Sequence, residues 1–436
     1  MSERIESEFG LIPIDWEIAK FEDVAELRHG YQFRNYDFTE DGIKIVKITQ
    51  IKGDGHIDIS NCSFIDKNRI ESFKKFIIEK GDILLALTGA TIGKFARYKE
   101  DEIVLQNYRV GNFFPLDYNV LSKDYLYYYL SSDFFYFQII ARQTQSAQQN
   151  IGKDEINNMS IILPKFEEQK EIAKTLSNLD KKITLLRQQN QDLEELAQIL
   201  FKRWFVEFEF PNENGEPYKS SGGNMIESEL GEIPEGWRVT QLKKLADKIS
   251  KGTTPRKNEV DGLELDVPFI KVKDITDDGQ IKFGDIESIP NSVHNGSLKR
   301  SILNRNDILF SIAGTIGRVT IVPEDLNNSN CNQAVAFIRL KEIQHLELIH
   351  QWFKSQSVQN EINASIVQGV QANVSLGVLG NLLFNIPNDE FIEKWNAVIK
   401  PIYEKCNNCS NEIQTLTQLR DTLLPKLMSG ELKVKA

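Results

Sequence analysis

The chain contains one internal repeat that spans nearly its whole length. The segment SEFGLIPIDW at residues 7–16 matches SELGEIPEGW at residues 228–237, an offset of 221. Further along, DILLALTGATIG from Asp82 matches DILFSIAGTIG from Asp307 in the same order. Because the offset shifts by only a few residues, the halves differ by small loop changes. The repeat therefore predicts two similar modules in one chain and not a longer solenoid.

Each module reads as a mixture of strands and helix. Short β-like runs occur at residues 43–51 and 267–272, and one helix-like stretch per half lies near residues 123–142 and 342–364. The mixture predicts an α+β fold with two similar α/β globules. At about 150 residues per domain, the 436 residues correspond to roughly three structural units.

A second kind of segment follows each globule. From residue 166 to 205 the apolar residues step by alternating fours and threes, and the same stripe recurs 223 residues later. This 3.5-residue period predicts two long helices that separate the globules and pair as an antiparallel coiled coil. The alternative, in which each helix packs only on its own globule, stays open, and Pro401 should kink or delay the second helix. The predicted pairing residues are Leu176, Leu179, Ile183, Leu186, Leu193, Leu200, Ile402, Cys406, Cys409, Ile413, Leu416 and Leu423.

Composition and charge limit the possible environments and partners. No apolar run approaches the roughly 18 residues that cross a bilayer, and the start MSERIESEFG lacks the layout of a signal peptide. We therefore expect a cytoplasmic protein with no membrane partner, whose four cysteines are reduced. The net charge of −11 means that nucleic acid would have to be bound through local basic patches or with help from partners.

The patterns that suggest an enzyme are weak. GATIGK at residues 89–94 resembles a phosphate-binding loop, but it is one residue short and Phe95 follows where Ser or Thr is needed. Cys406 and Cys409 form a CxxC without a second pair, so we interpret both as apolar helix residues. We expect no metal site, no cofactor in this chain and no catalysis by the chain alone.

Two segments carry a family resemblance. LFKRWFVEFEFP at residues 200–211 and LLPKLMSGELKV at residues 423–434 resemble the two conserved regions of specificity subunits of type I restriction-modification systems. The resemblance implies a non-catalytic subunit with two target-recognition domains, each reading half of an interrupted site in double-stranded DNA, while the helices set the gap. It also implies two modification subunits that bring S-adenosylmethionine, and restriction subunits that use ATP and Mg.

The repeat and the resemblance together divide the chain into four regions. These are a first target-recognition domain at residues 1–165, a central conserved helical region at 166–222 for spacing and partner docking, a second target-recognition domain at 223–388, and a C-terminal conserved helix at 389–436. A runner-up hypothesis is a coiled-coil protein scaffold that does not contact DNA. Salt-dependent binding to duplex DNA separates the two hypotheses.

The candidate DNA-contacting residues are basic, hydroxyl and amide side chains in loops that correspond between the halves. Basic groups suit phosphates, arginine suits guanine, and amide side chains suit adenine. The loops are RHGYQFR at residues 28–34 and SKGTTPRK at 250–257. Lysines in strand-like runs and two amide-rich loops add further candidates. The predicted residues are Arg28, Tyr31, Gln32, Arg34, Lys47, Gln143, Gln148, Lys251, Thr253, Thr254, Arg256, Lys257, Lys271, Lys273 and Gln371.

Overall fold

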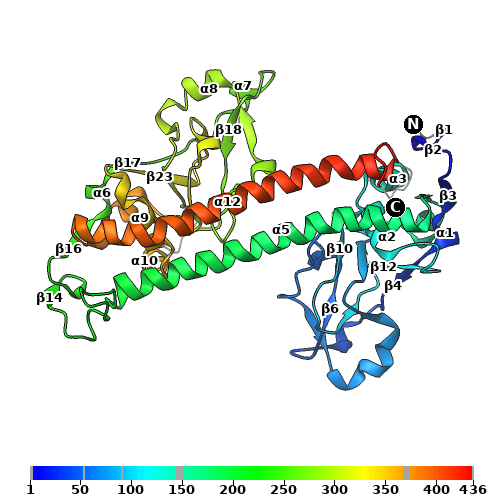
Figure 1. Cartoon of the computed structure of the whole chain (residues 1–436), viewed down its shortest axis with the longest axis horizontal. Helices are drawn as coiled ribbons and strands as arrows, with labels where there is room; N and C mark the ends of the chain where they lie inside the picture. The colour runs from blue at the N-terminus through cyan, green and yellow to red at the C-terminus, as the bar shows by residue number, and fades with distance from the viewer. Residues whose placement is uncertain (1–2, 53–54, 90–91, 144–150, 367–372, 435–436) are drawn as a thin grey trace. The chain divides into compact units, whose positions relative to one another are not determined.

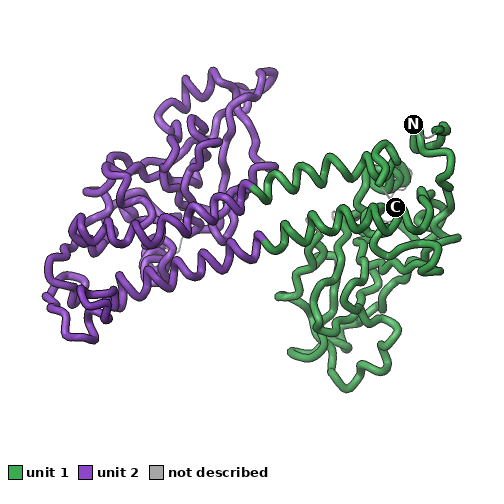
Figure 2. Tube along the Cα trace, in the orientation of Figure 1, with its two compact units in different colours: residues 1–185, 412–436 green, residues 186–411 purple. Residues whose placement is uncertain are grey.

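The computed structural model forms two compact units (Figure 2). Unit 1 comprises residues 1–185 and 412–436, and unit 2 comprises residues 186–411. The helices α5 (Phe166–Phe201) and α12 (Asp389–Met428) are labelled in Figure 1. Each helix is divided between the two units, with one part in unit 1 and the other in unit 2. The structure describes residues 3–52, 55–89, 92–143, 151–366 and 373–434.

Unit 1 is built on two sheets, with strand orders β10-β9-β12-β4 and β5-β7-β6-β11-β8. The hairpin β1-β2 and the pair β13-β3 complete its strands. The strands are β1 (Arg4–Ser7), β2 (Gly10–Pro13), β3 (Glu17–Lys20), β4 (Ala25–His29), β5 (Phe38–Thr39), β6 (Ile43–Val46), β7 (Ser63–Ile65), β8 (Ile77–Ile78), β9 (Ile83–Ala86), β10 (Phe95–Arg97), β11 (Val104–Gln106), β12 (Val110–Pro115) and β13 (Ser160–Leu163). Its shorter helices are α1 (Phe21–Val24), α2 (Lys123–Leu130), α3 (Asp133–Gln143) and α4 (Lys153–Asn157).

Unit 2 repeats this plan, with strand orders β17-β23-β20-β21 and β19-β18-β22 and the pairs β14-β15 and β16-β24. The parallel pair β18–β22 corresponds to β6–β11 of unit 1. The strands are β14 (Met225–Ser228), β15 (Gly231–Pro234), β16 (Arg238–Gln241), β17 (Ala246–Lys251), β18 (Val267–Ile270), β19 (Glu287–Ile289), β20 (Ile308–Ser311), β21 (Val319–Ile321), β22 (Asn330–Cys331), β23 (Val335–Leu340) and β24 (Leu383–Ile386). Its shorter helices are α6 (Leu242–Leu245), α7 (Lys257–Val260), α8 (Asn291–Asn295), α9 (Leu346–Lys354), α10 (Gln356–Ser365) and α11 (Leu376–Asn381). The predicted α+β fold with two repeated globules is confirmed.

Strand β9 is covered on both faces, which explains its continuous apolar run. Ile83 and Leu85 pack into the cluster that contains α2 and α3, whereas Leu84 and Ala86 pack into a cluster with strands of the five-stranded sheet. Because side chains alternate along a strand, both faces of β9 are covered and all four residues are buried. The aromatic run of residues 125–137 supplies much of the first cluster.

In the first globule, the SE-G-IP-W motif anchors the start of the domain to the long helices. Trp16 Nε1 donates a hydrogen bond to Glu168 Oε2 of α5 at 2.9 Å. Gly430, which follows α12 and has a φ of 65°, lies against Pro13, where an added Cβ would be 2.4 Å from the proline Cγ. The glycine is thus required both by the left-handed backbone and by the close approach.

Within each unit, α5 and α12 contact each other in opposite chain directions. In unit 1, Arg420 Nη1 pairs with Asp180 Oδ1 at 3.0 Å, and Lys182 Nζ pairs with Glu412 Oε1 at 3.2 Å. All of the predicted pairing residues are buried or half-buried. The expectation that Pro401 delays the second helix is wrong, because α12 is helical from Asp389 onward and carries the proline on an exposed position.

In unit 2 the same antiparallel contacts continue. Asn190 Nδ2 donates to Ser410 Oγ at 3.0 Å, and the rings of Phe201 and Trp395 meet edge to face with centroids 6.3 Å apart. Trp395 and Ile399 are fully buried in the core of the unit. Because this part of α12 is packed into the core, the helix continues through Pro401 although the proline has no backbone N–H to donate.

Candidate nucleic-acid interface

One end of the first globule brings together the loop after β4 and the turn between β11 and β12. The N–H of Tyr31 donates to the carbonyl oxygen of Gln106 at 2.9 Å, and the N–H of Tyr108 donates to the carbonyl oxygen of Tyr31 at 2.9 Å. Gly30 permits this approach, because a Cβ there would lie 2.2 Å from the Gln106 oxygen. The predicted loop 28–34 is therefore held against the turn by its backbone.

Two more segments reach the same end. The N–H of Asn107 donates to the carbonyl oxygen of Val46 at 3.0 Å, so Lys47, the next residue, lies beside the turn. The N–H of Leu87, which follows β9, donates to the carbonyl oxygen of Arg109 at 3.1 Å. The ends of β4, β6, β9 and β11 thus converge. We call this arrangement of strand ends the strand-end frame, and loop side chains can project from it.

The predicted side chains of this loop differ in their exposure and in the contacts that they make within the globule. Gln32 and Arg34 are exposed and contact each other, with Arg34 Nη2 3.4 Å from Gln32 Oε1. Arg28 is half-exposed, pairs with Glu26 at 3.1 Å and lies 4.2 Å from the centre of the Phe114 ring. Arg34 is therefore better placed than Arg28 to contact an external anion.

The side chains of Tyr31 and Lys47 make more contacts with other residues of the globule. Tyr31 is half-buried, and its ring centre lies 4.9 Å from that of Phe73 and 5.1 Å from that of Phe33. Lys47 Nζ donates to Ser63 Oγ at 2.6 Å and lies 4.8 Å from a neighbouring ring centre. Both residues lie at the same end of the globule as Gln32 and Arg34, with part of their side-chain surface covered by other residues of the chain.

Unit 2 builds the same frame from different residues. The N–H of Thr253 donates to the carbonyl oxygen of Cys331 at 3.2 Å, and the N–H of Asn332 donates to the carbonyl oxygen of Ile270 at 3.0 Å. Gly252 takes the role of Gly30, since an added Cβ would lie 1.9 Å from the Cys331 oxygen. Lys271, directly after β18, corresponds to Lys47.

The second loop carries hydroxyl groups that are already oriented. The Thr254 hydroxyl contacts the Gln333 amide oxygen, and Arg300 Nη2 donates to Thr253 Oγ1 at 2.9 Å. Lys251, Arg256 and Lys257 are exposed. These three cations and the two threonines form one surface, which we call the second-loop surface.

The remaining predicted lysines of unit 2 are paired with an acid. Lys271 Nζ and Lys273 Nζ lie 2.6 Å and 2.9 Å from the carboxylate oxygens of Glu287. Hydrogen bonds from the two ammonium groups lower the pKa of Glu287 to about 2. A DNA phosphate would have to compete with this carboxylate for either lysine.

The amide-rich loops lie partly outside the described residues. Gln148 and Gln371 fall there, and Gln143 is the last residue of α3, with no described side-chain position. The chain that follows each loop returns to the same frame, because Ile151 N–H donates to Leu87 O at 3.0 Å and Val374 N–H donates to Ile312 O at 2.9 Å.

The β11–β12 turn and its counterpart in unit 2 were not among the predicted contact segments. Tyr108 and Arg109 lie at the first end, where Arg109 Nε donates to Tyr108 Oη at 2.6 Å. Gln333 and Arg300 lie at the second end. In the repeat, NYR at residues 107–109 aligns with NQA at 332–334, but only strand pairing shows that these residues face the predicted loops.

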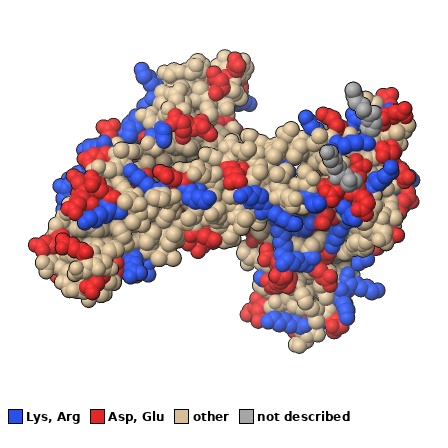
Figure 3. Space-filling model, viewed as in Figure 1, with Lys and Arg blue, Asp and Glu red and all other residues tan. Residues whose placement is uncertain are grey.

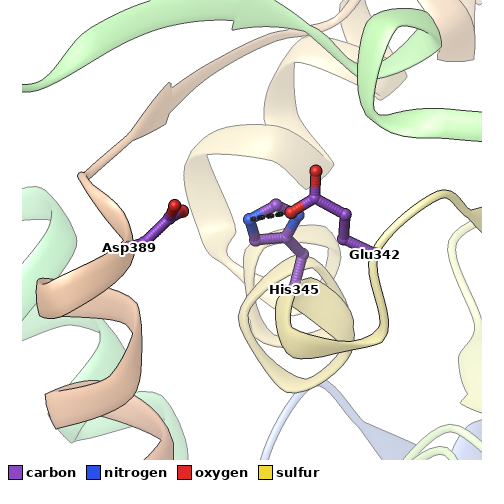
Figure 4. A group of neighbouring side chains, drawn as sticks. All are labelled: Glu342, His345 and Asp389. Atoms are coloured by element: carbon purple, nitrogen blue, oxygen red, sulfur yellow. Dashed lines mark ion pairs between the residues drawn. The ribbon is translucent and has the colours of Figure 1, made fainter.

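The surface charge and the thiols complete the chemistry of the described residues. Figure 3 shows acidic and basic side chains interspersed over the face in view, so a positive potential has to be local. Burial raises the pKa of Cys406 to about 11, which disfavours a reactive thiolate. A separate group of possible metal ligands consists of Glu342 and His345, which follow β23, and Asp389, which begins α12 (Figure 4).

Duplicated α+β globules on two long helices, each with a loop-bearing end, define a class of paired recognition modules. The family described as "Type I restriction modification DNA specificity domain" matches residues 13–195 and 234–418. The chain belongs to this family, the specificity subunits of type I restriction-modification systems, which are non-catalytic. This confirms the resemblance noted in the sequence.

Named relatives match over most of their length. The type I restriction enzyme MjaIX specificity subunit of Methanocaldococcus jannaschii is 28% identical, over 99% of this chain and 96% of the relative. The HindI specificity subunit of Haemophilus influenzae is 25% identical, over 85% and 91%. The crystal structure of an S subunit from M. genitalium has the same fold, with a TM-score of 0.52, 16% identity and coverage of 95% and 96%.

Among the described residues, no helix is both long enough and apolar enough to cross a membrane.

Proposed function

We propose that this chain reads an interrupted site in double-stranded DNA, with each globule contacting one half-site through the strand-end frame described above. The observation that carries the proposal is that the two frames share backbone contacts but differ in side chains. Gln32 and Arg34 stand where Thr254 and Arg256 stand in the second loop, and Tyr108 stands where Gln333 does. One scaffold with exchanged side chains suits the reading of two different base sequences.

The side chains at each frame have the chemistry for this role. Exposed Arg34, Arg256 and Lys257 can contact phosphates, and either arginine can bind the O6 and N7 atoms of guanine. Gln32 and Gln333 can pair with adenine. Lys47, Lys251, Lys271 and Lys273 would supply phosphate contacts that fix register and carry no sequence information.

We further propose that α5 and α12 pair as an antiparallel coiled coil and set the gap between half-sites. The contacts of Asp180 with Arg420 in unit 1 and of Asn190 with Ser410 in unit 2 support this pairing. At about 1.5 Å per residue, the 36 residues of α5 measure roughly 54 Å. The regions 166–222 and 389–436 then act as spacer and docking site, and the regions 1–165 and 223–388 act as recognition domains.

The proposed partners are those of the family. Two modification subunits would dock on the helices and bring S-adenosylmethionine, and restriction subunits would bring ATP and Mg. The net charge of −11 supports a need for partners, because an acidic chain gains little from the phosphate backbone alone. We propose that the complex works in the cytoplasm.

Methylation-site mapping tests the proposal directly. Cells that carry this chain with its modification subunits should show one bipartite methylated motif, which disappears when the chain is deleted and returns when it is restored. A control with an unrelated specificity chain should produce a different motif. If deletion leaves every methylated motif in place although the partners are expressed, the scaffold hypothesis is favoured and the DNA-reading role is wrong.

A further inference from the structure

Three possible ligand groups from two elements of unit 2 meet beside the first turn of α12 (Figure 4). Glu342 precedes the short helix η10 (Ile343–His345), His345 ends it, and Asp389 is the first residue of α12. One ligand atom of each residue lies within 4.8 Å of the other two. Figure 4 shows the imidazole ring between the two carboxylates.

The histidine at the centre of this group has an unsatisfied nitrogen. His345 is 5% exposed, and its Nε2 has no hydrogen-bond partner among the described residues. The nearest carboxylate oxygen, Glu342 Oε2, is 3.9 Å away, beyond hydrogen-bond distance. A buried polar atom without a partner carries a desolvation cost, and a ligand between the ring and the carboxylates would remove it.

The charged groups around the ring attract a cation. Burial lowers the pKa of His345, while Glu342 and Asp389 act to raise it and Arg238 acts to lower it. An imidazole ring binds a metal ion through the lone pair of an unprotonated ring nitrogen. Two carboxylates and one guanidinium leave a local negative charge that attracts a divalent cation.

We propose that Glu342, His345 and Asp389 bind one Zn²⁺ ion, with water completing its coordination. An imidazole with two carboxylates suits zinc, whereas Mg²⁺ and Ca²⁺ prefer oxygen ligands alone. Zinc ligands lie at about 2.0–2.2 Å from the metal, so the donors must move closer. Both carboxylates can do so because they are exposed.

The ion would have a structural role in unit 2. It would join the segment between β23 and α9 to the first turn of α12. Further along α12, Asn396 Nδ2 already donates to Gln344 O at 2.9 Å. The first half of the chain has no equivalent group, because the repeat places Val120 opposite His345 and Phe166 opposite Asp389. We therefore expect one ion per chain, and this proposal does not depend on DNA recognition.

Zinc binding by the full-length chain tests the proposal. After chelator treatment, dialysis against Zn²⁺ followed by elemental analysis should give one ion per chain and a higher melting temperature. Glu342→Gln and Asp389→Asn should each weaken binding by about tenfold or more, with the zinc-free melting temperature unchanged. Glu390→Gln is the matched control, since this exposed carboxylate pairs with Lys394.

Two further variants distinguish the imidazole of His345 from the thiols as the source of zinc binding. The double variant Cys406→Ser and Cys409→Ser should keep full zinc binding, and His345→Gln should lose it. If the wild type binds no zinc, if the carboxylate variants bind it as tightly as the wild type, or if the cysteine variant loses it, the proposed site is wrong. Excess Mg²⁺ should leave the zinc content unchanged, and displacement by Mg²⁺ would also contradict the assignment.

Discussion

At the scale of single residues, the proposed DNA contacts depend on which side chains are exposed and which are paired within the fold. Lys271 and Lys273 share the single carboxylate of Glu287, whereas the side chains of Arg256 and Lys257 are exposed. The Arg256 N–H donates to Glu259 at 2.8 Å, so the backbone of this arginine is fixed while its side chain is exposed to solvent. We expect the second-loop surface to carry more of the contact energy than the paired lysines.

Replacing Arg256 and Lys257 by alanine should weaken recognition of one half-site only. Loss of an arginine that contacts guanine costs about 1–3 kcal/mol, and each lost phosphate contact lowers the salt slope of binding by about 1. Arg28→Ala with Arg34→Ala is the matched pair in the other globule. Binding of the complex to DNA with one half-site scrambled measures the effect, and equal losses at both half-sites would refute the loop assignment.

The buried His350 should make unit 2 sensitive to acid. Its Nδ1 lies 2.5 Å from Tyr403 Oη, and burial lowers the pKa of His350 well below 6.5. As pH falls below 6.5, the unfolded chain takes up a proton at this histidine that the folded chain does not. Acidification therefore lowers the free energy of unfolding. Between about pH 6.5 and about pH 5.5, the free energy of unfolding should fall by about 1 kcal/mol.

Urea unfolding at these two pH values measures the difference, with His350→Gln as the test variant and the exposed His29→Gln as its control. The His350 variant should lose less stability on acidification than the wild type, and the His29 variant should behave like the wild type. Parallel pH profiles for all three proteins would show that His350 does not cause the effect.

At the scale of elements, the repeat and the hydrophobic period predicted most of the architecture. The repeat predicted two similar globules, and both contain the same parallel strand pair, β6–β11 and β18–β22. The pattern could not predict that α12 passes through Pro401, since helix continuity there depends on the tertiary packing of Trp395 and Ile399. Nor could it predict that Arg109 lies beside the loop of Arg34, because that contact requires pairing between distant strands.

Gly252→Ala should disrupt the second frame. The added Cβ would lie 1.9 Å from the Cys331 carbonyl oxygen, so the loop or the β22 end must move, at a cost of about 1–3 kcal/mol. Gly284→Ala is the matched control, because nothing lies within 4 Å of its added Cβ. We expect the first variant to lower both the melting temperature and second half-site binding. Wild-type binding by Gly252→Ala would show that the loop does not need this close approach.

At the scale of the whole molecule, we expect DNA binding to be a property of the assembly, because the chain is acidic overall. The chain has 52 basic and 63 acidic residues, so it should bind duplex DNA weakly alone and much more tightly with modification subunits that add phosphate contacts. Titration at one fixed salt concentration, with and without these subunits, measures the difference. Equal affinity in the two titrations would contradict a dependence on partners, and loss of tight binding at high salt is the internal control.

The spacing role of the helices can be tested by insertion near Asn190. Four added residues lengthen a helix by about 6 Å and make close to one turn, so the apolar stripe continues with a local disturbance. The half-sites should keep their sequences and move apart by one or two base pairs, at roughly 3.4 Å per base pair. A two-residue insertion is the matched control: it adds only about 3 Å but rotates the stripe by roughly 200°, which should cause misfolding or loss of partners. Methylation-site mapping decides the outcome, because an unchanged gap in a folded four-residue variant would mean that the helices do not set the spacing.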